Sequence, residues 1–169
     1  RMDKFVEDGR VSLERTLELV TQLSEFMEYV HSEKIYHRGI RPESLFISKD
    51  YALAIRPIYW EMLFALTVDS YQSVFTKRLT EGADSLTIND REMDIHSLGA
   101  IVCYLSTGYP PCEIPARQWC RYGLDPDLEE AVSRAIERPG FRHFTTVREF
   151  GEILEEMHSS DLSLTLARG

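Results

Sequence analysis

Helical periodicity is the feature of this sequence that most constrains its fold. Apolar side chains recur at steps of three and four residues from Leu13 to Val30, which predicts one long helix. The members of this stripe are Leu13, Leu17, Val20, Leu23, Met27 and Val30. Ser12 is the expected N-cap, and Glu14 stands in the first turn, where the helix dipole favours an anion.

The same helix carries a second apolar stripe through Leu19 and Phe26. A helix that is apolar on more than one side is normally buried among other elements. We therefore expect this helix to lie centrally in the fold and to end near residues 31–34.

Three further helices are predicted downstream. Asp94 is the expected N-cap of an apolar helix that should end at Thr107-Gly108. Asp125-Pro126 places a capping residue before a proline at the first helical position. Thr146, with Glu149 three residues later, forms a capping-box pattern that opens the last helix. Together these patterns indicate a mainly α-helical domain.

Two short apolar runs separate the first helix from the others. Leu45-Phe46-Ile47 and Ala52–Ile55 flank a Ser-Lys-Asp turn, which predicts a small β-hairpin. Residues 57–93 have no clean period and are expected to be irregular. Residues 159–169 alternate leucine with polar residues, so we expect a tail that is either an added strand or disordered.

The composition disfavours several classes of function. The chain has 28 acidic and 19 basic residues and a net charge of −9, the wrong sign for a nucleic acid or anionic lipid partner. The apolar stretch from Leu98 to Leu105 is much shorter than the ~20 residues that a membrane span needs. No secretory signal is expected, and three cysteines without CxxC spacing favour reduced thiols and a cytoplasmic location. The spacing of these cysteines and of His96 does not suit zinc, so we expect no metal.

The segment after the first helix carries the motif that most narrows the function. It reads His37-Arg38-Gly39-Ile40-Arg41-Pro42-Glu43-Ser44. This resembles the catalytic loop of eukaryotic-type protein kinases, whose pattern is H-R-D-x-K-P-E-N. Residues 31–36, 94–99 and 107–111 resemble further kinase motifs, in the family's order. The resemblance covers residues 1–158 and implies a kinase-like C-lobe, an incomplete kinase fold, followed by a tail of residues 159–169.

The resemblance also implies that the chemical groups of this loop have been replaced. Gly39 stands in the place of the catalytic aspartate, Ser44 in that of the magnesium-binding asparagine, and Arg41 in that of a phosphate-contacting lysine. Where the family has D-F-G, this sequence has Ile55-Arg56-Pro57-Ile58, with a cation in place of the metal-binding carboxylate. Nothing resembles the glycine-rich phosphate loop or the V-A-I-K lysine, so we expect the small lobe to be missing.

These replacements predict a protein that is not an enzyme. Phosphoryl transfer needs a carboxylate to orient the substrate hydroxyl and metal ions to neutralise phosphate charge. Gly39 supplies no side chain, Ser44 could supply one neutral oxygen, and Arg56 would repel magnesium. We therefore expect a pseudokinase that uses no cofactor and does not bind ATP.

Other residues of the resemblance have structural interpretations. His37 could be a general base by type, but in the kinase pattern this histidine is a packing residue. Arg38 in active relatives can bind a phosphate, and a bond to a local carbonyl or carboxylate is the favoured alternative here. Asp94 is implied to accept backbone N–H groups of the catalytic loop. Arg142 is implied to pair with a glutamate, for which Glu81 is the best candidate.

Exposure suggests a function in protein binding. Without a small lobe, the hairpin and the top of the large lobe are uncovered, and an exposed apolar patch is often a binding site. The aromatic stretch of residues 57–68, with Tyr59, Trp60 and Phe64, is the candidate interface; the alternative is that it folds back over the hairpin and covers the surface left by the missing lobe. We expect a scaffolding or regulatory module that binds a protein partner or a second copy of itself. The alternatives are part of a larger two-lobed pseudokinase or regulatory domain, or a kinase-fold nucleotidyl transferase with residual nucleotide binding.

Overall fold

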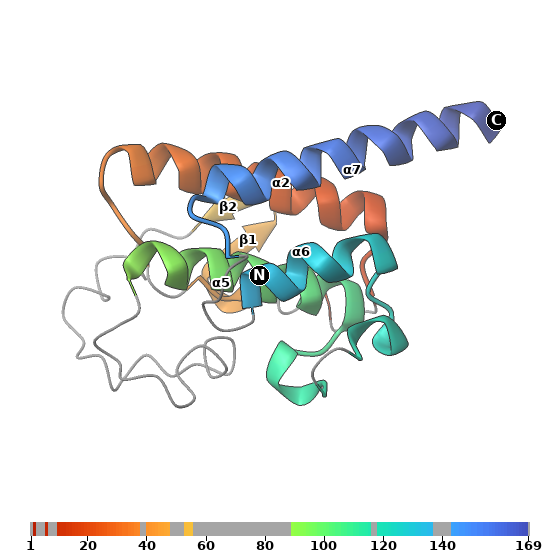
Figure 1. Ribbon diagram of the computed structural model, residues 1–169, viewed down its shortest axis with the longest axis horizontal. Helices are drawn as coiled ribbons and strands as arrows, with labels where there is room; N and C mark the ends of the chain where they lie inside the picture. Colours follow the sequence, from red (N-terminus) through yellow and green to blue (C-terminus); the bar gives the residue numbers. More distant parts are fainter. Residues whose placement is uncertain are drawn as a thin grey trace.

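The computed structural model is built mainly of α-helices, with one small sheet (Figure 1). It describes residues 2, 6, 10–37, 40–47, 53–55, 89–115, 118–136 and 143–168. The long helices in these residues are α2 (Leu13–Ser32), α5 (Asp90–Thr107), α6 (Pro126–Ile136) and α7 (Val147–Arg168). Short 3-10 turns are η1 (Pro42–Ser44), η3 (Pro111–Glu113) and η4 (Trp119–Tyr122). The prediction of a mainly α fold with a short β-hairpin is confirmed.

The hairpin lies where the sequence predicts it. Strands β1 (Leu45–Ile47) and β2 (Leu53–Ile55) pair antiparallel, with Phe46 opposite Ala54. Strands of three residues carry few ladder bonds, so this sheet depends on the helices beside it.

Helices α2 and α7 run antiparallel and side by side, and α5 packs against α2 and α6 (Figure 1). The C-terminal part of α7 projects beyond the beginning of α2 in this view. Residues 94–103 of α5 are all buried, so this part of the helix is surrounded on every side. The core therefore forms around α5.

The contact between α5 and α6 depends on a glycine. A Cβ added at Gly99 would lie 2.6 Å from Cβ of Ala135 and 3.2 Å from Cγ1 of Ile136. Only glycine lets the two helices approach this closely at that point. Trp119, Phe144 and Phe150 are the largest fully buried side chains of the core that surrounds this contact. In the described part of the chain no helix is long and apolar enough to cross a membrane.

The ends of α2 show how local sequence sets its length. Ser12 is the N-cap as expected, and its Oγ accepts a hydrogen bond from the backbone N–H of Arg15 at 3.3 Å. At the other end, the backbone N–H of Lys34 donates to the carbonyl of His31 at 3.0 Å and that of Ile35 to Val30 at 2.9 Å. This pair of bonds is a Schellman motif, in which the residue after the C-cap is left-handed. Lys34, with φ of 61°, occupies the position where glycine is preferred.

The expected N-cap of α5 was wrong. The helix begins at Asp90, and its N-cap is Asn89, whose Oδ1 accepts from the backbone N–H of Glu92 at 2.9 Å. Oε2 of Glu92 accepts from the backbone N–H of Asn89 at 3.3 Å, which completes a capping box. The first turn is polar and does not belong to the apolar pattern, so the periodicity placed the start one turn too late, at Asp94.

Two further expectations were also wrong. Residues 159–168 continue α7 to Arg168 and form neither a separate strand nor a disordered tail. Within α7 the sequence has no proline, and the next glycine after Gly151 follows the helix at residue 169, so no stop signal interrupts it. The second apolar stripe of α2 is only half buried, because Leu19 is inaccessible whereas Phe26 is 37% exposed.

The start of α7 resembles the predicted capping box with one difference. The backbone N–H of Glu149 donates to Oγ1 of Thr146 at 3.2 Å, as expected. The Glu149 carboxylate, however, accepts from the backbone N–H of Thr145 at 3.0 Å rather than from that of Thr146. The box therefore closes one residue earlier than the pattern predicts.

Candidate functional site

The candidate site is the loop from His37 to Ser44, which leads from α2 to β1. The loop is held by apolar and aromatic burial, because His37, Ile40 and Leu45 are all inaccessible to solvent. Arg38 and Gly39, the two residues that follow His37, lie outside the described residues.

A single carboxylate joins the loop to the helical core. Oδ2 of Asp94, on α5, accepts a hydrogen bond from the backbone N–H of His37 at 2.8 Å. The same oxygen lies 2.9 Å from Nε2 of His31, in the last turn of α2. Asp94 is completely buried, so these bonds form where they are strong. Asp94 thus makes the bond to the loop backbone that the kinase resemblance implies.

The His31 contact was missed by the sequence analysis. His31 is only partly buried, and its ring packs on Tyr36 with centroids 4.9 Å apart. The signal was available, because a histidine at the end of a helix six residues before the loop can reach whatever anchors that loop. Its partner could not be found without the tertiary fold, since Asp94 lies 63 positions away in the sequence.

The His37 ring is a packed side chain in this arrangement. Burial lowers the pKa of His37 below its ordinary value of 6.5, and the nearby Asp94 carboxylate opposes this effect less strongly. A neutral ring with no solvent exposure has no access to a substrate hydroxyl.

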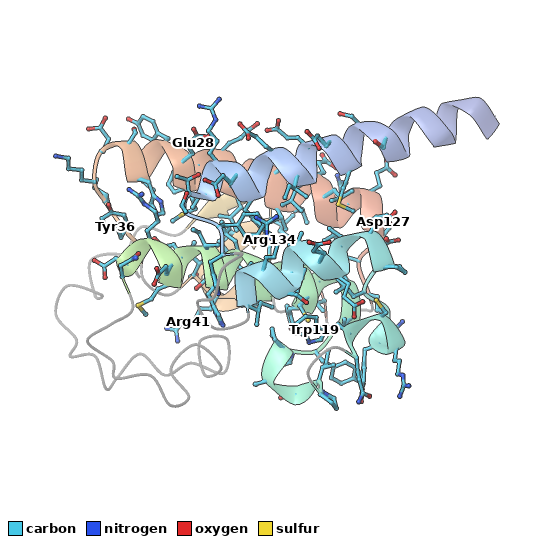
Figure 2. The ribbon with its side chains drawn as sticks, in the orientation of Figure 1. Glu28, Tyr36, Arg41, Trp119, Asp127 and Arg134 are labelled. Atoms are coloured by element: carbon cyan, nitrogen blue, oxygen red, sulfur yellow. The ribbon has the colours of Figure 1, made fainter. Side chains whose placement is uncertain are left out.

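Ser44 is engaged within the loop itself. Its Oγ donates to the carbonyl of Arg41 at 2.7 Å and accepts from the backbone N–H of Arg41 at 3.2 Å. These two bonds close the η1 turn, and the residue is only 1% exposed to solvent. The side chain of Arg41, by contrast, is exposed, and Figure 2 shows it on the side of the molecule away from Glu28.

Several predicted site residues cannot be placed. These are Arg38, Gly39, Arg56, Tyr59, Trp60, Phe64, Glu81 and Arg142, all of which lie outside the described residues. The Glu81–Arg142 ion pair and the aromatic interface therefore stay predictions.

A cavity of about 450 Å³ lies beside the loop. It is bounded by Tyr36, by the first turn of α5 from Asn89 to Glu92, and by residues 143–145 before α7. Within the described ranges, no group of three or more His, Cys, Asp or Glu side chains could hold a metal ion. The described part of the site thus offers hydrogen-bonding surface without a set of metal ligands.

Known proteins with similar sequences are serine/threonine protein kinases. The kinase PknA of Nostoc sp. is 27% identical over 168 residues, which is 90% of this chain and 30% of that protein. The CBL-interacting protein kinase 8 of Arabidopsis thaliana is 30% identical over 118 residues, 64% of this chain and 25% of that protein. No family model matches the sequence.

A solved structure extends this likeness to the fold. The PknI kinase domain of Mycobacterium tuberculosis superimposes with a TM-score of 0.69 over 92% of this chain and 61% of that domain, at 20% identity. The chain has a protein-kinase-like fold. It spans 30% or less of the two curated kinases named above. The helices and the short hairpin of the described residues fit a partial, C-lobe-like kinase fold.

Proposed function

We propose that this chain is a catalytically inactive, kinase-like C-lobe that acts by binding another protein. The observation that carries the proposal is the position of Ser44. A magnesium ligand must direct an oxygen lone pair at the ion. Ser44 Oγ is buried and is engaged with both the carbonyl and the N–H of Arg41, so it is poorly placed to do this.

The neighbouring substitutions support the same conclusion. Gly39 has no side chain with which to orient a substrate hydroxyl, and Arg56 brings positive charge to the position where the family binds magnesium. The loop retains the apolar residues that fold it, and replaces those that would perform chemistry.

Phosphate transfer and nucleotide binding test the catalytic half of this proposal. The purified chain is incubated with radiolabelled ATP, magnesium or manganese, and a generic protein substrate. We expect no incorporation above a blank and no rise in Tm with ATP, because a ligand that binds the native state must raise it. The double variant Gly39→Asp/Ser44→Asn should also stay inactive, because Arg56 remains. Incorporation by either protein would overturn the proposal.

The second half of the proposal, that the chain binds another protein, concerns the aromatic segment with Tyr59, Trp60 and Phe64. Six large apolar side chains within residues 59–66 favour a protein partner or a second copy, because exposed aromatic residues promote association. Trp119 is fully buried, so a red-shifted, readily quenched component of tryptophan emission reports Trp60. We expect that component to be absent in a complex or dimer and to appear on dissociation, monitored by sedimentation. A red-shifted signal at all concentrations and with every partner tested would exclude this segment as the interface.

The relatives favour one second candidate, a regulatory kinase-like domain with two lobes. The chain spans only 30% of PknA, a serine/threonine kinase, so a longer protein of that kind would contain segments that this sequence does not include. ATP binding by the product of the full reading frame, combined with no binding by this chain alone, would select this candidate.

A further inference from the structure

The seam between α2 and α7 brings together two acidic helix faces that are far apart in the sequence. The helices approach closely because position 151 is glycine, where an added Cβ would lie 3.2 Å from Cβ of Ser24. Residues 25–28 of α2 therefore meet residues 148–155 of α7. Figure 2 shows Glu28 where the beginning of α7 lies beside α2.

A groove of about 120 Å³ runs along this seam. Ser24, Val147 and Gly151 line it together with five charged residues. Those are Glu25, Glu28, Arg148, Glu152 and Glu155. Four carboxylates thus share the groove with one guanidinium, and its net charge is strongly negative.

Arg148 shows that the groove stabilises a positively charged side chain. Its Nε lies 2.9 Å from Oε1 of Glu152, and one of its terminal nitrogens lies 3.8 Å from Oε1 of Glu28 across the seam. The hydrogen bond to Glu152, followed by the charge of Glu28, raises the pKa of the Arg148 guanidinium. Neither Glu25 nor Glu155 has an ion-pair partner among the described residues, so acidic capacity remains for a further cation.

Ser24 adds an independent sign of a missing ligand. The residue is 3% exposed, and its Oγ has no hydrogen-bond partner in the part of the chain that the structure describes. Buried hydroxyl groups in folded proteins normally have a partner. A donor that entered the groove from outside would supply one.

A metal ion does not suit this groove. The described residues contain no group of three or more acidic or histidine side chains close enough to hold one. An arginine or lysine head group is different, because it sits on a flexible stem and bonds carboxylates that are spread over several ångströms.

We propose that this groove binds a basic segment of a partner protein, with an arginine or lysine side chain donating to Ser24 Oγ and to the flanking glutamates. The inference rests on the proposed binding function and names the chemistry of its partner. Charge complementarity decides the occupant, since the exposed Glu33 at the C-cap of α2 and the exposed Glu156 on α7 add negative charge outside the groove.

Fluorescence anisotropy with a labelled alanine-based peptide, which carries arginine at every fourth position, tests the proposal. The groove variant Glu25→Gln/Glu155→Gln is compared with Glu33→Gln/Glu156→Gln, which has the same net charge and leaves the groove intact. We expect the groove variant to bind about tenfold more weakly and the control to change less than about threefold. Equal losses in the two variants, or no binding by the unmodified chain, would overturn the proposal.

Ser24→Ala separates a binding role from a structural one. Removing a buried hydroxyl without a partner should leave Tm unchanged or raise it, while peptide binding falls about threefold. Unchanged binding by Ser24→Ala, or displacement of the peptide by an equal concentration of spermine, would exclude the proposed contact. If the peptide does not bind and phosphate transfer is also absent, the groove assignment fails and the inactive module stands. If transfer is detected while the peptide binds, the proposed inactivity fails and the groove stands.

Discussion

The helical body and the loop-hairpin region of this molecule are held together in different ways. The body consists of α2, α5, α6 and α7, whose apolar faces form one buried cluster. The described residues between Ile40 and Ile55 form one 3-10 turn and two three-residue strands. Ile40 and Leu45 join the same buried cluster, and the hydroxyl of Ser44 adds hydrogen bonds to the backbone of the turn. Burial therefore holds both regions, and side-chain hydrogen bonds to the backbone supplement it in the loop-hairpin region.

The bond between the two regions should have the largest effect when it is removed. Asp94→Ala deletes the acceptor of the His37 N–H and of His31 Nε2, and leaves both groups buried or nearly so. We expect a loss of about 3 kcal/mol in the free energy of unfolding by urea. Exposed Glu156→Ala is the control and should change stability by less than about 0.5 kcal/mol. If the two variants were equally stable, the loop would not depend on Asp94.

Within the helical body, the close contact of α5 and α6 can be tested alone. Gly99→Ala places a methyl group 2.6 Å from Cβ of Ala135, so one helix must shift. We expect a loss of about 1–3 kcal/mol in unfolding free energy. The double variant Gly99→Ala/Ala135→Gly should recover part of that loss, because it removes the clashing carbon. No recovery would mean that the cost arises elsewhere in the core.

The loop region should respond to pH through His37. Burial lowers the pKa of the folded ring below 6.5, whereas the unfolded chain titrates near 6.5. The unfolded state therefore binds the proton more readily, and stability present above about pH 6.5 is lost as the pH falls towards the folded pKa. Asp94 and Arg41 are the charged groups that act on this ring, in opposite directions.

We expect the difference in unfolding free energy between the unmodified chain and His37→Gln to shrink on acidification. Its slope should be at most about 1.4 kcal/mol per pH unit. Parallel profiles for the unmodified chain and His37→Gln would show that this ring does not titrate differently on folding.

A substitution at the end of α2, where the helical body meets the loop, should have the smallest effect and should raise stability. Lys34 is left-handed at the end of α2, where glycine has no steric cost. Lys34→Gly should therefore raise the free energy of unfolding by about 0.5–1 kcal/mol, measured by urea unfolding. Glu33→Gly is the matched control, because the φ of Glu33 is −83° and glycine there should destabilise. A loss in both variants would show that the Lys34 side chain makes a compensating contact.

The sequence predicted which segments are helical better than it predicted where those helices begin and end. Ser12, Pro126 and Thr107-Gly108 mark helix ends correctly, because capping chemistry is local. The start of α5 was missed because its first turn is polar, and α7 was cut short because alternating leucines after residue 158 resemble a strand. Both errors come from helix turns whose residues do not follow the apolar period of 3.6 residues.

Of the candidate site, the sequence predicted only the contact that the kinase-like motifs imply. The order of kinase-like segments predicted that Asp94 would contact the His37 loop, and the structure has that bond. The partner of His31 and the meeting of Glu28 with Arg148 are tertiary facts, because each contact joins residues far apart in the sequence. The bonds of Ser44 to Arg41 are local, since the two residues are three positions apart, but the kinase pattern did not predict them.

The bonds of Asp94 also bear on the order in which the chain folds. They join residues 57 and 63 positions apart, whereas the cap of α2 joins residues three positions apart. Contacts of large sequence separation require a long loop to close first, and the entropy of that closure delays them. We therefore expect the His37 loop to become fixed only after α2 and α5 have docked, so this loop is among the last parts of the chain to reach its final place.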